Sequence, residues 1–276
     1  MKKKKVLYSI SIIISVIVIW GILHLWELCA EKGAHYTPDY PRVNLQLYVK
    51  KEKLEKGDYE LLFKQTGLGP AAINTLWDEG RREEIVRVQE YFFEEVAVSC
   101  ERNTVISKEE SLHKDGGDYK VYIPVIDEGD ILLTFNTHVF GWRVGHAALV
   151  VNAKEQKTLE ARVLGTDSTV MTMSHWEKYP SFVVLRLKGI PLEECSLIAE
   201  NALHKLQGVP YSLHAGLLGQ GKGTHCSHLV WSAFKQYGYD LDSDGSWPVT
   251  PRDIFESPLL EIVQVYGMNP EALKKY

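Results

Sequence analysis

The chain has 276 residues, of which 45% are hydrophobic and 24% charged, and its formal net charge is −5. This length allows one substantial hydrophobic core, or one core with a smaller appended region. The negative balance excludes a general nucleic-acid binder, because phosphate contacts require a surplus of lysine and arginine on one face. We therefore expect a globular protein without a nucleic-acid partner.

The N-terminus departs from this globular composition. Lysines at residues 2–5 directly precede an uncharged run over residues 6–23. A bilayer span needs about 20 apolar residues, whereas the core of a signal peptide has about 7–15. We predict a transmembrane anchor (or an uncleaved signal) over residues 1–30 that contacts the membrane through residues 6–26. The positive-inside rule then predicts a single-pass cell-membrane protein whose remaining chain is extracytoplasmic.

The next part of the chain predicts a linker and then helices. Residues 31–56 contain Pro38, Pro41 and several turn-forming residues, which favours a linker. Residues 57–118 are predicted as a small helical region that begins with a helix capped by Asp58.

A second, longer helix is expected within that region over about residues 82–100, where apolar side chains recur mostly at helical spacing. The charged segment "SKEESLHKDGGDYK" (residues 107–120) contains two adjacent glycines, and we place a domain boundary there. The following domain is predicted to occupy residues 119–276.

This last domain has a different pattern of short, β-branched apolar segments separated by turn residues. The predicted strands are residues 130–135, 146–153, 158–163, 181–187 and 261–267. Helices are predicted over residues 191–207 and from residue 226 to a glycine at 238. Because no regular β-α-β alternation is present, the pattern predicts an α+β fold.

Cys226 lies in the first turn of the second of these helices, after the glycine-rich segment "GQGKGT". The unpaired N–H groups and the dipole of a helix N-terminus favour a thiolate over a thiol. The same N–H groups can donate to the oxyanion that forms when a thiolate attacks an acyl carbon. This position predicts a cysteine nucleophile.

A cysteine nucleophile needs a base, and His146 is the best placed of the ten histidines because it begins an apolar strand. Glu160 lies in the next predicted strand between Leu159 and Ala161, where a carboxylate needs a partner. We predict a triad of Cys226, His146 and Glu160. Taken singly, each of these residues is also compatible with a structural role, so the prediction depends on their combination.

The cysteines have two further possible roles, metal binding and disulfide formation. His225, Cys226 and His228 are chemically suitable zinc ligands, but adjacent residues of a helical turn point about 100° apart. We therefore expect neither a metal nor a cofactor. A disulfide between Cys100 and Cys195 remains open, because export allows oxidation.

The ordered motifs "EGDILLTF", "VGHAALVV", "LEA", "GVPYS", "THCSHLVWSAF" and "VTPRDIFESPLLEIV" resemble the circularly permuted, YiiX-like branch of the NlpC-type papain-like cysteine hydrolases. The resemblance covers about residues 125–267. It implies a permuted papain-like domain with an antiparallel sheet packed on the cysteine-bearing helix. It also implies that Cys226 is the nucleophile, His146 the base and Glu160 its orienting residue, with Tyr211 lining the substrate site.

The activity that the resemblance implies is cleavage of an amide bond through a thioester acyl-enzyme. With the predicted anchor, this indicates an outward-facing peptidase or amidase acting on cell-wall peptides such as peptidoglycan. One alternative is an amidase, thioesterase or acyltransferase acting on lipid-linked acyl groups, for which Leu213, Leu217 and Leu218 would suit an acyl chain. The other alternative is a non-catalytic binding module.

Overall fold

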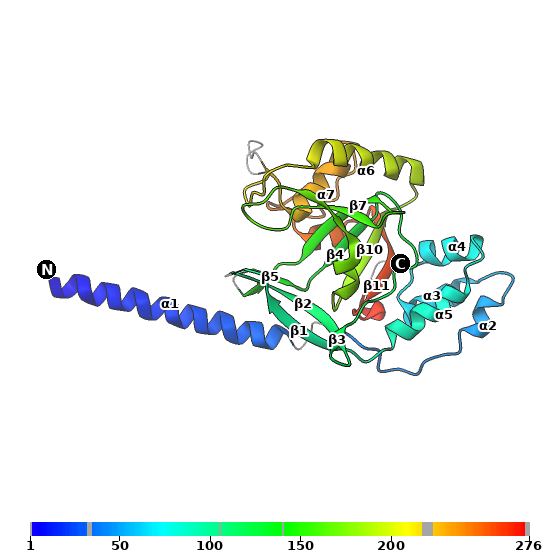
Figure 1. Cartoon of the computed structure of the whole chain (residues 1–276), viewed down its shortest axis with the longest axis horizontal. Coiled ribbons are helices and arrows are strands. Elements are labelled where there is room, and N and C mark those ends of the chain that lie inside the picture. Colours follow the sequence, from blue (N-terminus) through cyan, green and yellow to red (C-terminus); the bar gives the residue numbers. More distant parts are fainter. Residues whose placement is uncertain (1, 32–34, 105, 140, 217–222, 274–276) are drawn as a thin grey trace.

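The computed structural model describes residues 2–31, 35–104, 106–139, 141–216 and 223–273. Two antiparallel sheets form the centre of the protein, and helices lie on both sides of the larger sheet (Figure 1). The α+β class and the antiparallel sheet predicted from the sequence are confirmed.

The larger sheet has six strands in the order β11-β10-β4-β7-β8-β9, all paired antiparallel. Its strands are β4 (Ile131–Thr134), β7 (His146–Asn152), β8 (Lys157–Glu160), β9 (Thr169–Thr172), β10 (Phe182–Leu187) and β11 (Leu260–Tyr266). Five of them match the predicted strands to within a few residues at each end. Strand β9 was not predicted.

Both faces of this sheet are buried. Leu132 and Leu133 are adjacent in β4, so their side chains point to opposite faces. Each is fully buried, and they belong to different apolar clusters. Burial on both faces explains why the strand segments are nearly continuous apolar runs and do not alternate with polar residues.

In the described part of the chain, helices cover both faces of the larger sheet. The helices on the first face are α6 (Leu192–Leu206), α7 (Cys226–Lys235) and α8 (Pro251–Glu256), and those on the second are α3 (Lys56–Thr66), α4 (Pro70–Asp78) and α5 (Glu83–Phe92). Helix α7 packs directly on β7, which confirms the predicted packing of the cysteine-bearing helix on the sheet. Short helices α2 (Gln46–Val49), η1 (Met173–Lys178) and η3 (Pro270–Ala272) complete this part of the fold.

The smaller sheet corrects the predicted helix over residues 82–100. Helix α5 ends at Phe92, and the chain then enters β1. The sheet consists of β1 (Ala97–Arg102), β2 (Ser107–Lys114), β3 (Gly117–Asp118), β5 (Thr137–Val139) and β6 (Trp142–Arg143). The apolar residues after Phe92 continue the helical spacing, but pairing of β1 with β2 provides backbone hydrogen bonds to a strand instead.

Helix α1 (Lys2–Glu31) extends away from the rest of the protein (Figure 1). The predicted transmembrane anchor over residues 1–30 is wrong, because no helix in the described part of the chain has the length and apolar character that a membrane crossing requires. The same finding contradicts the predicted single-pass membrane location, and the predicted membrane contact through residues 6–26 stays a prediction.

The cysteines are not cross-linked in the described part of the chain: Cys100 and Cys195 form no disulfide. They lie in different parts of the fold, since Cys100 is in β1 of the smaller sheet and Cys195 is buried in α6.

Candidate active site

Cys226 is the first residue of α7, as the sequence predicts. The preceding residue, His225, has an extended backbone and caps the helix, because its side chain accepts a hydrogen bond from the His228 N–H. The approach to this helix is tightly packed: Gly223 has φ of 125°, and a Cβ there would lie 2.6 Å from the Ser212 Cβ. The chain therefore needs a glycine at position 223, three residues before Cys226.

His146 is the first residue of β7 and is 5% exposed. Its Nε2 lies 2.7 Å from Glu160 Oε2, and its ring stacks on the indole of Trp176 at 5.5 Å between centroids and 16° between planes. These two contacts fix the orientation of the ring. Interaction with the Cys226 thiol raises the pKa of the ring, so Nδ1, the nitrogen that does not face Glu160, is the one available to the sulfur.

Glu160 ends β8 and is almost fully buried. One carboxylate oxygen accepts from Thr158 Oγ1 at 2.5 Å and from Trp176 Nε1 at 3.0 Å, and the other faces His146 and, at 3.3 Å, His175 Nε2. Burial alone raises the pKa of this carboxyl, but the hydrogen bonds and charges of the two histidines hold it well below its ordinary value. Glu160 is therefore a stable carboxylate beside the base.

The cysteine and the histidine form a charged pair. Burial raises the pKa of the Cys226 thiol, but hydrogen bonds and charges from His146 and His225 outweigh it and lower the pKa to about 5. For His146, burial lowers the pKa, and contacts with Cys226 and Glu160 outweigh it and raise the pKa to about 9. Between these two values the pair is a thiolate beside an imidazolium.

Tyr211 is brought beside the cysteine by an isolated parallel bridge to Thr224, with a hydrogen bond from the Ser212 N–H to the Thr224 carbonyl at 2.8 Å. Burial, and next the charge of Cys226, raise the pKa of the Tyr211 phenol above its ordinary value, so it remains protonated. Its hydroxyl can therefore act as a hydrogen-bond donor.

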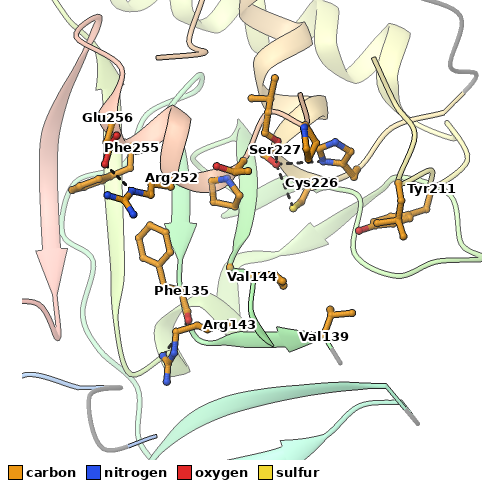
Figure 2. A pocket seen from close by; sticks show the side chains of 17 residues that line it. Phe135, Val139, Arg143, Val144, Tyr211, Cys226, Ser227, Arg252, Phe255 and Glu256 are labelled. Atoms are coloured by element: carbon orange, nitrogen blue, oxygen red, sulfur yellow. Dashed lines mark hydrogen bonds and ion pairs between the residues drawn. The ribbon is translucent and has the colours of Figure 1, made fainter. Parts of the chain in front are cut away.

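A pocket of about 810 Å³ opens beside Cys226. Figure 2 shows Cys226 between Tyr211 on one side and Phe135 and Phe255 on the other. The apolar side chains of the lining are Phe135, Val139, Val144, Leu213, Pro248, Val249, Pro251 and Phe255. Residues 217 and 218, the other two leucines predicted to suit an acyl chain, lie outside the described residues.

The charged side chains of the pocket are matched by partners. Arg143 Nη2 lies 2.7 Å from the buried Glu110 Oε1, and Arg252 Nε lies 2.8 Å from Glu256 Oε1. Each arginine of the lining is therefore paired with a glutamate, and the rest of the lining is largely apolar.

His225 and His228, on either side of Cys226, each contact protein groups. His225 caps α7, and His228 Nδ1 lies 3.1 Å from Thr224 Oγ1. Within the described residues, the grouping of side chains that could share a metal ion consists of Asp242, Asp244 and Asp253. His225, Cys226 and His228, the alternative zinc ligands, do not form such a grouping among the described residues.

Sequence reasoning missed two side chains that hold the triad, His175 and Trp176. Both lie in η1, within the segment "MSHWEK". A helix of this length has no apolar periodicity from which to place its side chains. An isolated tryptophan next to a histidine, shortly after a predicted strand with a buried acid, is the one local feature that could have drawn attention to them.

Comparisons with known proteins show a distant similarity to a solved structure. No family model matches the chain. No curated protein matches it either. The crystal structure of metalloprotein yiiX from Escherichia coli O157:H7, DUF1105, is similar to it at 15% sequence identity and a TM-score of 0.38, over 50% of this chain and 96% of that one. A similarity of this size assigns no chemistry, so the site has to be interpreted from its own geometry.

Proposed function

We propose that this protein is a cysteine hydrolase that cleaves an acyl bond through a thioester intermediate. The observation that carries the proposal is the continuous contact from Cys226 through His146 to Glu160. A nucleophile, a base and a residue that orients the base are the three groups that such chemistry needs. The charged pair keeps the nucleophile ionised at neutral pH.

The reaction follows from the positions of the two ring nitrogens of His146. The Cys226 sulfur donates an electron pair to the acyl carbon and forms a C–S bond, while the carbonyl electrons move to oxygen. As this oxyanion collapses, the bond to the leaving group breaks and His146 Nδ1 gives its proton to the leaving nitrogen or oxygen. Water then attacks the thioester, His146 takes one of its protons, and the C–S bond breaks to release the acid and restore the thiolate.

Donors for the oxyanion are available at the start of α7. The Cys226 N–H is one of the first four helix N–H groups, which have no acceptor within the helix. Tyr211, whose raised pKa keeps the hydroxyl protonated, also lines the pocket. Such preorganised donors typically contribute about 3–4 kcal/mol each to transition-state stabilisation.

The proposal is tested by comparing the full chain with Cys226→Ala on muropeptides and on acylated lipids, with products identified by mass spectrometry. We expect turnover of one class and a loss of about 10³-fold or more in the variant, because the residual rate comes from binding alone. Cys100→Ala is the matched control, since Cys100 lies in the smaller sheet. Binding without any Cys226-dependent product would favour a non-catalytic module instead.

A peptide amide is one candidate substrate, and the apolar lining of the pocket favours a second, an acyl group with a hydrocarbon chain. Each buried methylene contributes about 0.8 kcal/mol, which is about fourfold in kcat/KM. We therefore expect kcat/KM for p-nitrophenyl esters to rise with acyl length until the pocket is filled. Val144→Asp, at the exposed edge of the pocket, should flatten this rise and leave acetate cleavage unchanged. A rate independent of acyl length would contradict the second candidate.

A further inference from the structure

One polar atom beside the proposed nucleophile has no hydrogen-bond partner. His225 directly precedes Cys226, lines the pocket and is 7% exposed. Its Nε2 is fully buried, and within the described residues no protein group forms a hydrogen bond with it. Such atoms are rare in folded proteins, because a buried polar atom without a partner has lost its hydrogen bonds to water. A substrate bound in the pocket can supply the missing partner.

The ring of His225 also lies near the reacting sulfur. Burial raises the pKa of the Cys226 thiol, and interactions with His146 and then with His225 oppose it and lower the pKa to about 5. The two histidines reach the sulfur from different elements, His146 from the start of β7 and His225 from the residue before α7. Nε2 of His146 faces Glu160, whereas Nε2 of His225 faces no protein partner in the described part of the chain.

The cap of α7 decides which nitrogen of His225 carries the proton. His225 Nδ1 lies 3.4 Å from the backbone nitrogen of His228 and accepts its N–H. A backbone N–H can only donate, so Nδ1 presents a lone pair and the neutral ring carries its proton on Nε2. The Ser227 hydroxyl is 3.3 Å from the same nitrogen and 2.8 Å from the Val249 carbonyl, and it can donate to either. The unpartnered atom is therefore an N–H donor.

We propose that His225 is a further catalytic residue: its Nε2–H donates a hydrogen bond to the oxyanion that forms when Cys226 attacks an acyl carbon. This inference rests on the proposed function. As the C–S bond forms, the carbonyl electrons move to oxygen, and the N–H stabilises that charge without transferring its proton. Collapse of the oxyanion then breaks the bond to the leaving group and frees the donor.

A donor without a protein partner is well suited to this role. An interaction that is stronger in the transition state than in the ground state lowers the barrier, whereas one that is equally strong in both does not. The Nε2–H of His225 gives up no protein acceptor when the oxyanion forms. The backbone N–H of Cys226, in the first turn of α7, supplies a second donor. Oxyanion holes commonly combine backbone N–H groups with side-chain donors in this way.

Two substitutions separate the donor from the helix cap. The amide of an asparagine side chain reaches about as far as histidine Nδ1, and that of glutamine about as far as Nε2. His225→Asn therefore keeps a capping side chain and removes the donor beside the sulfur. His225→Gln keeps an N–H at the longer reach and loses the cap, so we expect its thermal unfolding midpoint to lie below that of His225→Asn. His204→Asn, at an exposed position of α6, is the matched control.

The test compares two reactions of Cys226 in the full chain. p-Nitrophenyl acetate acylates the sulfur through an oxyanion, and p-nitrophenolate leaves without needing a proton. Iodoacetamide alkylates the sulfur at a saturated carbon, so no oxyanion forms. Acylation is measured as the p-nitrophenolate release that Cys226→Ala abolishes, and alkylation by mass spectrometry of the labelled peptide. Both are measured at a pH where the alkylation rate has reached its plateau in each variant, so that Cys226 is a thiolate throughout.

The ratio of acylation to alkylation isolates the stabilisation of the oxyanion. We expect this ratio to fall about 10²-fold in His225→Asn, because the loss of one oxyanion donor typically costs at least that much. It should stay within about 10-fold of the wild type in His225→Gln and should not change in His204→Asn. A residue that acts only on the thiolate would change both rates in parallel and leave the ratio constant.

The outcomes separate the two proposals. An unchanged ratio in His225→Asn overturns the oxyanion role of His225 and leaves the proposed function standing. A fall in His225→Gln as large as that in His225→Asn also overturns it, because the loss then does not follow the donor. A wild-type Cys226 that reacts with neither reagent faster than Cys195 does overturns the proposed function, and this inference with it.

Discussion

His146→Ala is expected to slow alkylation of Cys226 by iodoacetamide about 10²-fold near pH 6. In the wild type the pKa of Cys226 is about 5, so the thiolate dominates at that pH. Burial raises this pKa, and His146 is the first of the two histidines that oppose it. Without the imidazole the thiol should titrate near or above its ordinary value of 9.0, which leaves little thiolate near pH 6.

The pH dependence makes this prediction specific. At pH values above the ordinary thiol pKa the variant also ionises, so the difference from the wild type should shrink to a few-fold. Cys195 is an internal comparison, because burial raises its pKa to about 11 and it should react slowly throughout. Mass spectrometry of the labelled peptides separates the sites. Equal rates for Cys100, Cys195 and Cys226 would remove the case for an activated nucleophile.

The parts of the fold that the sequence predicts well are those whose pattern is set by the core. Strands such as β10 are buried on both faces, so their apolar runs are continuous and bounded by turn residues. Strand β1 is different, because its burial is slight and it depends on pairing with β2. Its residues 97–100 continue the helical spacing of α5, and a long-range pairing partner cannot be recognised from local spacing.

The sequence predicts those site residues that stand out in a local sequence pattern. Cys226 begins a helix and His146 begins a strand, and Glu160 is a lone acid in an apolar strand, so each has a local pattern. Trp176 and His175 complete the same network from η1, and their contacts with Glu160 depend on how the chain folds back after β9. Side chains that meet only through tertiary structure have no such pattern.

The second large effect is expected on stability: Glu110→Gln should lower the free energy of unfolding by about 2–4 kcal/mol near pH 7. Glu110 is fully buried in β2. It binds His138 Nε2 at 2.7 Å and Arg143 Nη2 at 2.7 Å, and it also accepts from Asn136. In the variant a neutral amide replaces the carboxylate, so His138, Arg143 and Asn136 lose the charged acceptor of their hydrogen bonds. Because the Arg143 side chain is 22% exposed, water offsets part of the loss.

The sign of the pH dependence distinguishes this pairing from simple packing. Burial raises the pKa of Glu110, but His138, Asn136 and Arg143 outweigh it and hold the pKa below its ordinary value of 4.5. A carboxyl with a lowered folded-state pKa stabilises the protein above its unfolded-state pKa, and this stability is lost as the pH falls through the folded-state value. Denaturant unfolding should therefore show a large difference in unfolding free energy between the wild type and Glu110→Gln near neutral pH, and this difference should shrink in acid.

Glu101→Gln, at an exposed position of β1, is the matched control, with an expected change in unfolding free energy within about 0.5 kcal/mol. A constant difference across this pH range would assign the loss to packing rather than to the carboxylate.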